Sequence, residues 1–182
     1  MAESVIIRPR LQSDMDACVS LLRQLHEHDN YPLIWPADPH AWLCGNRQVM
    51  AWVASREEII CGHVALTVPR SGAAATRVWE KSLRTEQPGL LSIALLFISP
   101  QARGCGIGGR LLDTALAAAR AKGAAPVLEV ITLNQQAIAL YQARGWRRIG
   151  SVHYDWLPHN ERSLLFVAPP EMAAGHLKEK SI

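Results

Sequence analysis

Gly104, Gly106, Gly108 and Gly109 lie close together and form the segment of the chain best suited to bind a ligand. They follow an apolar run at residues 90–98 and precede a segment with helical periodicity. Glycine has no Cβ, so the backbone can approach a ligand closely. The first amides of a helix have no partner within it, and the helix dipole favours an anion there. The segment therefore predicts a phosphate site, and a pyrophosphate fits it.

Two common phosphate-binding motifs fit this segment poorly. A P-loop has Lys and then Ser or Thr after its last glycine, whereas this chain has Arg110 and Leu111. The dinucleotide fingerprint G-x-G-x-x-G is matched from Gly104 to Gly109, with Glu129 about 20 residues beyond. That fingerprint belongs to a first strand-helix-strand unit, but here about 100 residues precede it. Glu129 also lies inside a strand rather than at its end, which disfavours the dinucleotide fold.

A third motif fits the glycine segment, and a second motif follows it. Residues 103–108 match Q/R-x-x-G-x-G/A, and residues 134–146 match N-x-x-A-x-x-L-Y-x-x-x-G-W. These two motifs, in this order and after a strand and a proline, resemble the GNAT superfamily of N-acetyltransferases. The resemblance covers residues 90–150, and upstream only the order of the elements agrees.

The resemblance implies that acetyl-CoA is the cosubstrate. In this family the pantetheine arm lies between two separated central strands and bonds to strand backbone. By position, the arm is assigned to Leu96, Phe97 and Ile98, while Asn134 contacts the cosubstrate or serves only as a helix cap. The pyrophosphate is assigned to the turn and the helix start, namely Arg103, Gly104, Cys105, Gly106, Ile107 and Gly108, with Gly109 and Arg110 close by.

Acetyl transfer to an amine needs a neutral amine, a polarised carbonyl and a proton for the leaving thiolate. The resemblance implies Tyr141 as general acid, and a core aromatic is its alternative role. Many family members carry a glutamate base in the central strand, where this chain has Ser92. Others, including those that acetylate protein N-termini, carry it five residues before the asparagine, which is Glu129 here. Glu129 is therefore the expected base, and a structural glutamate is the alternative.

Weaker candidates for the base also stay open. They are Glu86, His63, His153 and Asp155, and ordered water could remove the proton instead. Cys105 lies inside the phosphate turn without a base partner, so we interpret it as a filler rather than an acyl-enzyme nucleophile.

Apolar periodicity predicts the elements that position these residues. Strands are expected at residues 5–7, 48–54, 59–68, 90–98, 126–132, 146–154 and 163–167, and helices at 13–25, 38–43, 107–119 and 134–145. The unit over residues 90–132 predicts a right-handed parallel crossover. With the resemblance, this pattern predicts an α/β single-domain fold of the GNAT type, with a mixed sheet of about seven strands and flanking helices.

Two connections are expected to shape the acceptor pocket. Residues 31–43 combine three prolines with Tyr31, Trp35 and Trp42, and these aromatics could equally cap the core. Residues 70–87 are small and polar and predict a mobile connection anchored by Trp79.

Length and composition limit the organisation and the partners of the chain. With 182 residues, 49% of them hydrophobic, we expect one domain at residues 1–168 and a tail at 169–182. A scattered net charge of +3 disfavours nucleic acid, and no run is long and apolar enough for a signal peptide or membrane span. Four widely spaced cysteines indicate no metal site. We expect a cytoplasmic protein without a membrane partner, and a homodimer stays open.

The sequence thus predicts an acetyl-CoA-dependent N-acyltransferase that acetylates a primary amine of a small molecule by direct attack. A protein N-terminus or a lysine is one alternative acceptor. A non-catalytic acyl-CoA-binding sensor or docking module on the same fold is the other alternative, favoured by the missing central-strand glutamate. Retention of Tyr141 favours the enzyme.

Overall fold

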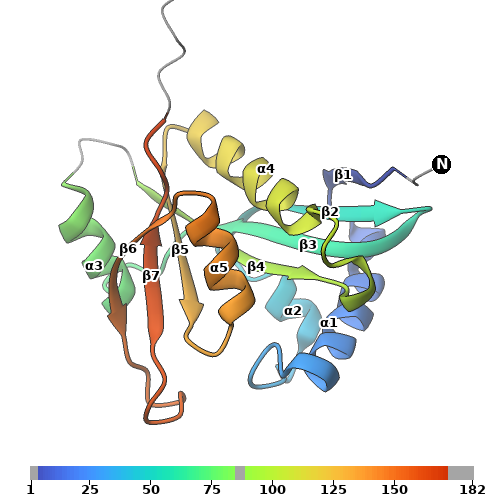
Figure 1. Ribbon diagram of the computed structural model, residues 1–182, viewed down its shortest axis with the longest axis horizontal. Coiled ribbons are helices and arrows are strands. Elements are labelled where there is room, and N and C mark those ends of the chain that lie inside the picture. The colour runs from blue at the N-terminus through green and yellow to red at the C-terminus, as the bar shows by residue number, and fades with distance from the viewer. Residues whose placement is uncertain (1–3, 85–88, 172–182) are drawn as a thin grey trace, which may run out of the picture.

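The chain folds into one seven-stranded sheet flanked by helices (Figure 1). The computed structural model describes residues 4–84 and 89–171. The strands are β1 (Ile6–Pro9), β2 (Gln48–Arg56), β3 (Ile59–Thr67), β4 (Leu90–Ile98), β5 (Ala125–Ile131), β6 (Arg147–Val152) and β7 (Ser163–Val167). The helices are α1 (Met15–Asp29), α2 (Pro39–Leu43), α3 (Ala74–Leu83), α4 (Ile107–Ala121) and α5 (Gln135–Ala143).

The sheet is mixed, as the sequence predicts. Its order is β1-β2-β3-β4-β5-β7-β6, which makes the apolar β4 the central strand. β4 and β5 are parallel and are joined through α4, whereas all other neighbours pair antiparallel. The predicted α/β class and seven-stranded sheet are therefore confirmed.

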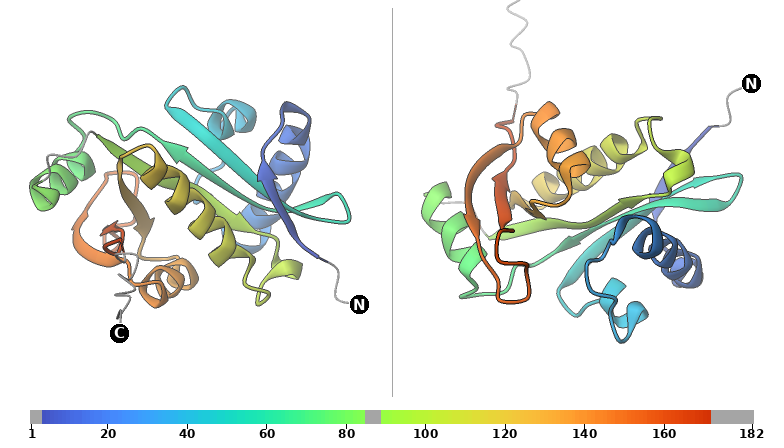
Figure 2. Two further views of the ribbon diagram at one scale, coloured as in Figure 1. Left: turned by 90° about the horizontal axis from the view of Figure 1, so that it is seen from above. Right: turned by 60° about the horizontal axis from the view of Figure 1, so that its bottom comes forward.

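Helices cover both faces of the sheet (Figure 2). α4 and α5 pack on one face, where Leu111, Leu128 and Phe166 belong to the main core. α1 and α2 pack on the other face, over Val53 and Phe97. α3 lies on this second face too, but against β6 and β7. The second face is thus covered at its two ends by different helices, with β5 between them.

The connection at residues 70–87 corrects the sequence prediction. It contains the helix α3, whose Trp79 is buried against Val127 and Leu165, so the expected anchor is present. This helix could not be predicted because the segment is small and polar in composition. Its few apolar residues gain a surface to pack against only in the tertiary structure. Residues 85–88, which include the candidate base Glu86, lie outside the described residues, as do residues 172–182 of the predicted tail.

Other boundaries differ from the prediction by a few residues. α1 continues four residues beyond Leu25 and ends where Asn30 adopts a left-handed φ of 53°. β6 ends at Val152, so residues 153 and 154 belong to the connection that leads to β7. Within the described chain, no helix has the length and apolar character that a bilayer crossing requires.

Candidate active site

A cleft of about 740 Å³ opens beside the glycine turn. Its walls come from the end of α1 and the loop after it, the end of β4, the turn before α4, and the start of α5. The size lies within the range of typical ligand sites. Because α1 and α5 cover opposite faces of the sheet, the cleft reaches both faces through the sheet.

Backbone amides at the start of α4 form the anion-binding end of the cleft. The N-cap Gly106 has φ +74°, and no side chain caps the helix. The first backbone bond of the helix is donated by the Arg110 amide to the Gly106 carbonyl, 3.1 Å away. The amides of Ile107, Gly108 and Gly109 therefore have no partner within the helix. This arrangement fits a pyrophosphate, as a dipole and three donors converge there.

The sheet opens where β4 and β5 part. Their last paired residues are Ile93 and Leu128, although both strands continue for several residues. Beyond this pair, the ends of the two strands line opposite sides of the cleft. An extended group can therefore lie between the strands and bond to their free backbone.

Most residues predicted to bind the cosubstrate line this cleft. They are Leu96, Phe97, Ile98, Arg103, Gly104, Gly106, Ile107, Gly108, Gly109 and Asn134. Asn134 also caps α5, because its Oδ1 accepts a hydrogen bond from the Ala137 amide at 3.1 Å. Cys105 is exposed and is not a lining residue. The Arg110 side chain also points elsewhere, since its guanidinium donates to the Val5 carbonyl at 3.0 Å.

An ion pair joins two walls of the cleft. The guanidinium of Arg103, in the glycine turn, binds the carboxylate of Asp29, at the end of α1. Both residues line the cleft, and each side chain is 34% exposed. The two residues are far apart in the sequence, so the periodicity of neither segment could predict the contact.

Tyr141 lies in the main core beside the cleft. Its side chain is 6% exposed and packs against Trp146 and Phe166. Burial raises the pKa of the Tyr141 phenol, and the nearby Tyr31 phenol adds to the rise. Tyr141 does not line the cleft, but the preceding residue, Leu140, does. The buried ring thus combines the predicted core role with a position next to the cleft.

Glu129 lies on the opposite face of the sheet from Tyr141. It pairs with Leu165 in β7, on the face that carries α3. Its Oε1 is buried and has no hydrogen-bond partner in the described structure. Tyr154 lies beside Glu129. Burial raises the pKa of the Tyr154 phenol, and the Glu129 carboxylate raises it further. No pattern in the sequence pointed to Tyr154, which was predicted to lie at the end of a strand.

The other described base candidates lie outside the cleft, as does Glu129. His63 is fully buried, and burial lowers its pKa to about 4. His153 and Asp155 are exposed in the connection between β6 and β7, where the His153 Nδ1 lies 3.1 Å from the Glu161 carbonyl. None of the three lines the cleft. In the described ranges, no group of three or more His, Cys, Asp and Glu side chains could hold a metal ion.

The two connections expected to shape the acceptor pocket differ in their position. Tyr31 and Leu33, in the loop after α1, line the cleft. Trp35 and Trp42 pack instead on the core beneath α1, which was the alternative role for these aromatics. The described residues of the 70–87 connection do not contribute to the cleft, because α3 packs at the far end of the sheet.

Comparison with known proteins relates this geometry to a family. The model of the acetyltransferase (GNAT) family matches residues 15–146. An uncharacterized protein of Mycobacterium leprae is 31% identical over 148 residues, which are 81% of this chain but 36% of that protein. The chain therefore spans about a third of that relative's length.

Solved structures share the fold. The ribosomal-protein-S18-alanine N-acetyltransferase of Escherichia coli has a TM-score of 0.66 at 17% identity, over 96% of this chain and 99% of that one. NAA60 of Arabidopsis thaliana, in complex with acetyl-CoA, has a TM-score of 0.67 at 23% identity, over 90% of this chain and 97% of that one.

Proposed function

Because the chain belongs to the acetyltransferase (GNAT) family, whose cosubstrate is acetyl-CoA, we propose that it acetylates the primary amine of a small molecule by direct attack. The observation that carries this proposal is the cleft, which joins the free amides of α4 to the opening between β4 and β5. The pyrophosphate of acetyl-CoA needs the free amides, and its extended pantetheine arm needs the opening between the strands. The two features must therefore lie side by side. The ring of Tyr31 lies next to Phe97 on the wall of the cleft and narrows the cleft there. A narrow cleft favours a small acceptor.

The lining of the cleft supports the residues that we propose to hold the cosubstrate. The amides from Arg103 to Gly109 bind the pyrophosphate, and the backbone from Leu96 to Ile98 binds the arm. A Cβ at Gly108 would lie 3.5 Å from both Ile98 and Leu140, in ordinary van der Waals contact with two residues that line the cleft. When bound, acetyl-CoA supplies an activated acyl group and a thiolate leaving group.

Proton transfer is divided between the two faces of the sheet. Tyr141 keeps its proton because its pKa is raised, and it donates this proton to the departing sulfur. Glu129 receives the proton of the attacking amine through its buried, unpartnered Oε1. An amine that enters beside α1 would thus meet the acyl group from the side opposite to Tyr141.

The experiment that tests this function is thiol release from acetyl-CoA across a panel of small amines, amino acids and short peptides. We expect turnover on a small primary amine. CoA binding without turnover on any acceptor would contradict the proposal and favour the acyl-CoA-binding sensor or docking module.

A peptide N-terminus is the second candidate acceptor. Tyr154, beside Glu129, stacks on Trp156 with ring centroids 5.6 Å apart, and Trp156 is 52% exposed. A partly exposed aromatic pair next to the base could hold the first side chains of a peptide. The Escherichia coli enzyme that shares the fold is named for a protein acceptor, an alanine of ribosomal protein S18. Turnover on the peptides of the panel, but not on the free amines, would select this candidate.

The Asp29–Arg103 ion pair leads to a prediction on cosubstrate affinity. Asp29→Asn releases Arg103 and removes a negative charge from a cleft that takes up polyphosphate. We expect the Kd for CoA to fall by about two- to fivefold at low ionic strength, the scale of a partly exposed ion pair. Calorimetric titration with CoA measures the change.

Asp16→Asn is the matched control for this prediction. Asp16 is 95% exposed and pairs with His40 away from the cleft, so its replacement should leave the Kd unchanged. Weaker CoA binding by Asp29→Asn would reverse the interpretation, because it would mean that Asp29 holds Arg103 in its binding position.

A further inference from the structure

The central strand β4 carries a bulge at the point where the sheet opens. Ala94 pairs with Ala65 and Phe97 pairs with His63, so Leu95 and Leu96 together oppose the single residue Val64. Leu95 has a left-handed φ of 54°, a conformation that is unfavourable for a residue with a side chain. Such a conformation persists only where neighbouring groups hold it.

The bulge immediately precedes the part of β4 that lines the cleft. The last residue of β4 that pairs with β5 is Ile93, and the lining residues Leu96, Phe97 and Ile98 follow the bulge. A bulge bends its strand and interrupts its pairing. The direction in which the end of β4 leaves β5 is therefore set at Leu95.

His63 is the group that holds the bulge. Its side chain is fully buried, and its Nδ1 lies 2.9 Å from the Leu95 carbonyl oxygen. Its ring stacks on Phe97 with centroids 4.9 Å apart and planes inclined by 17°. Phe97 in turn lies against Tyr31, on the wall of the cleft. One side chain thus fixes both the bulged carbonyl and an aromatic that lines the site.

Arg10 and the Leu95 carbonyl together fix which nitrogen of His63 carries the proton. Its Nη1 lies 2.9 Å from the His63 Nε2, and a guanidinium can only donate, so Nε2 must accept. The proton of the neutral ring is then on Nδ1 and is donated to Leu95. Burial lowers the pKa of His63 to about 4, and the charge of Arg10 also lowers it, so the ring stays neutral near pH 7.

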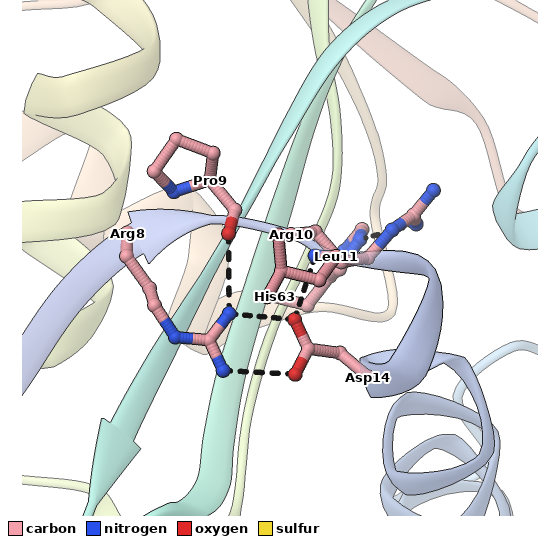
Figure 3. Close-up of polar contacts among 6 residues, drawn as sticks. All are labelled: Arg8, Pro9, Arg10, Leu11, Asp14 and His63. Atoms are coloured by element: carbon pink, nitrogen blue, oxygen red, sulfur yellow. Dashed lines mark hydrogen bonds and ion pairs between the residues drawn. The ribbon is translucent and has the colours of Figure 1, made fainter.

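Asp14 leaves Arg10 free for this contact (Figure 3). The Asp14 carboxylate binds Arg8 through two bonds of 2.6 and 2.8 Å and accepts a third bond from the Leu11 amide at 2.7 Å. Arg10 meets neutral acceptors instead, including the Leu43 carbonyl at 3.0 Å from Nη1. The contacts in the corner between β1 and α1 therefore direct the Arg10 side chain toward His63.

We propose that His63, in the tautomer set by Arg10, is a positioning residue for acetyl-CoA that holds the end of β4 in its binding geometry. The hydrogen bond to Leu95 keeps the bulge, and the bulge keeps β4 apart from β5. The proposal rests on acetyl-CoA as cosubstrate and does not depend on the acceptor.

Three substitutions at His63 separate its two hydrogen bonds. The amide nitrogen of His63→Asn can occupy the place of Nδ1 and donate to Leu95. The longer side chain of His63→Gln extends toward Arg10 instead, and His63→Leu makes neither bond. We expect the Kd for CoA, measured by calorimetry, to rise about tenfold or more in the Leu and Gln variants, as for misplaced binding groups. His63→Asn should stay within about threefold of wild type, and so should the exposed control His40→Leu.

Arg10→Met tests the tautomer without changing His63. It should raise the Kd for CoA by a smaller factor, about threefold, since Nδ1 then carries the proton only part of the time. Hydrogen exchange of the segment 92–98 should accelerate in the Leu and Gln variants and not in the Asn variant.

Wild-type CoA affinity in a folded His63→Leu or Arg10→Met variant would overturn the proposal. So would a His63→Asn variant that binds CoA no better than His63→Gln. Both of these outcomes are measured with CoA and without an acceptor, so a wrong assignment of the acceptor leaves them unaffected.

Discussion

Tyr141→Phe lowers kcat for acetyl transfer by about 100-fold or more, the usual contribution of a positioned general acid. The phenylalanine ring fills the same space against Trp146 and Phe166. The hydroxyl makes no hydrogen bond within the described chain, so its loss should cost little stability. CoA affinity should stay within about twofold of wild type, because the variant loses no group that lines the cleft. Steady-state thiol release and calorimetric CoA binding measure the two effects.

Tyr31→Phe is the control for this substitution. It removes a second phenol near Tyr141, from the wall of the cleft. If Tyr31→Phe loses the rate and Tyr141→Phe keeps it, Tyr31 is the proton donor and the assignment of Tyr141 is wrong.

The raised pKa of Tyr141 also predicts the pH dependence of kcat. Burial favours the neutral phenol, so the proton stays bound above the ordinary tyrosine pKa of about 10. We therefore expect no alkaline loss of kcat from Tyr141 up to that pH. A loss of kcat near pH 10 that disappears in Tyr141→Phe would contradict the buried position of the acid.

Glu129→Gln should lower kcat/KM for the amine by about 100-fold, because a carboxamide has the shape of the carboxylate but cannot take a proton. The loss should be greatest at low substrate concentration, where removal of the amine proton limits the reaction. Steady-state thiol release at several amine concentrations measures the effect.

Glu58→Gln, in the hairpin turn between β2 and β3, is the matched control and should behave as wild type. A second readout reports on the contact rather than on the rate. The Glu129 carboxylate contributes to the raised pKa of Tyr154, so Glu129→Gln should lower that pKa in an ultraviolet titration. Lowered Tyr154 pKa with a wild-type rate would show that the contact exists but that water or another group removes the proton.

The sequence by itself determined the elements that depend on local patterns. Apolar runs and spacing were enough for the parallel unit of β4, α4 and β5, because each strand is buried and the helix has one apolar face. The glycine turn could be predicted as a phosphate site because free amides at a helix start are a local property. Asn134 and Gly145 mark the ends of α5 for the same reason.

Only the tertiary structure decided how these elements meet. α3 has few apolar residues, and they gain a surface to cover only because Trp79 packs against β6 and β7. The Asp29–Arg103 ion pair joins segments that are distant in the sequence, and no local signal relates them. Likewise, the positions of Glu129 and Tyr141 on opposite faces follow from the sheet order and register.

The bulge at Leu95 shows the physical reason most clearly. Its residues form an ordinary apolar run, and leucine has no intrinsic preference for a left-handed φ. The conformation is held by His63 from the neighbouring strand and by Arg10 from the corner that follows β1. A pattern of residues along the chain can specify which segments are buried, but a strained backbone at a site is specified by the side chains that surround it.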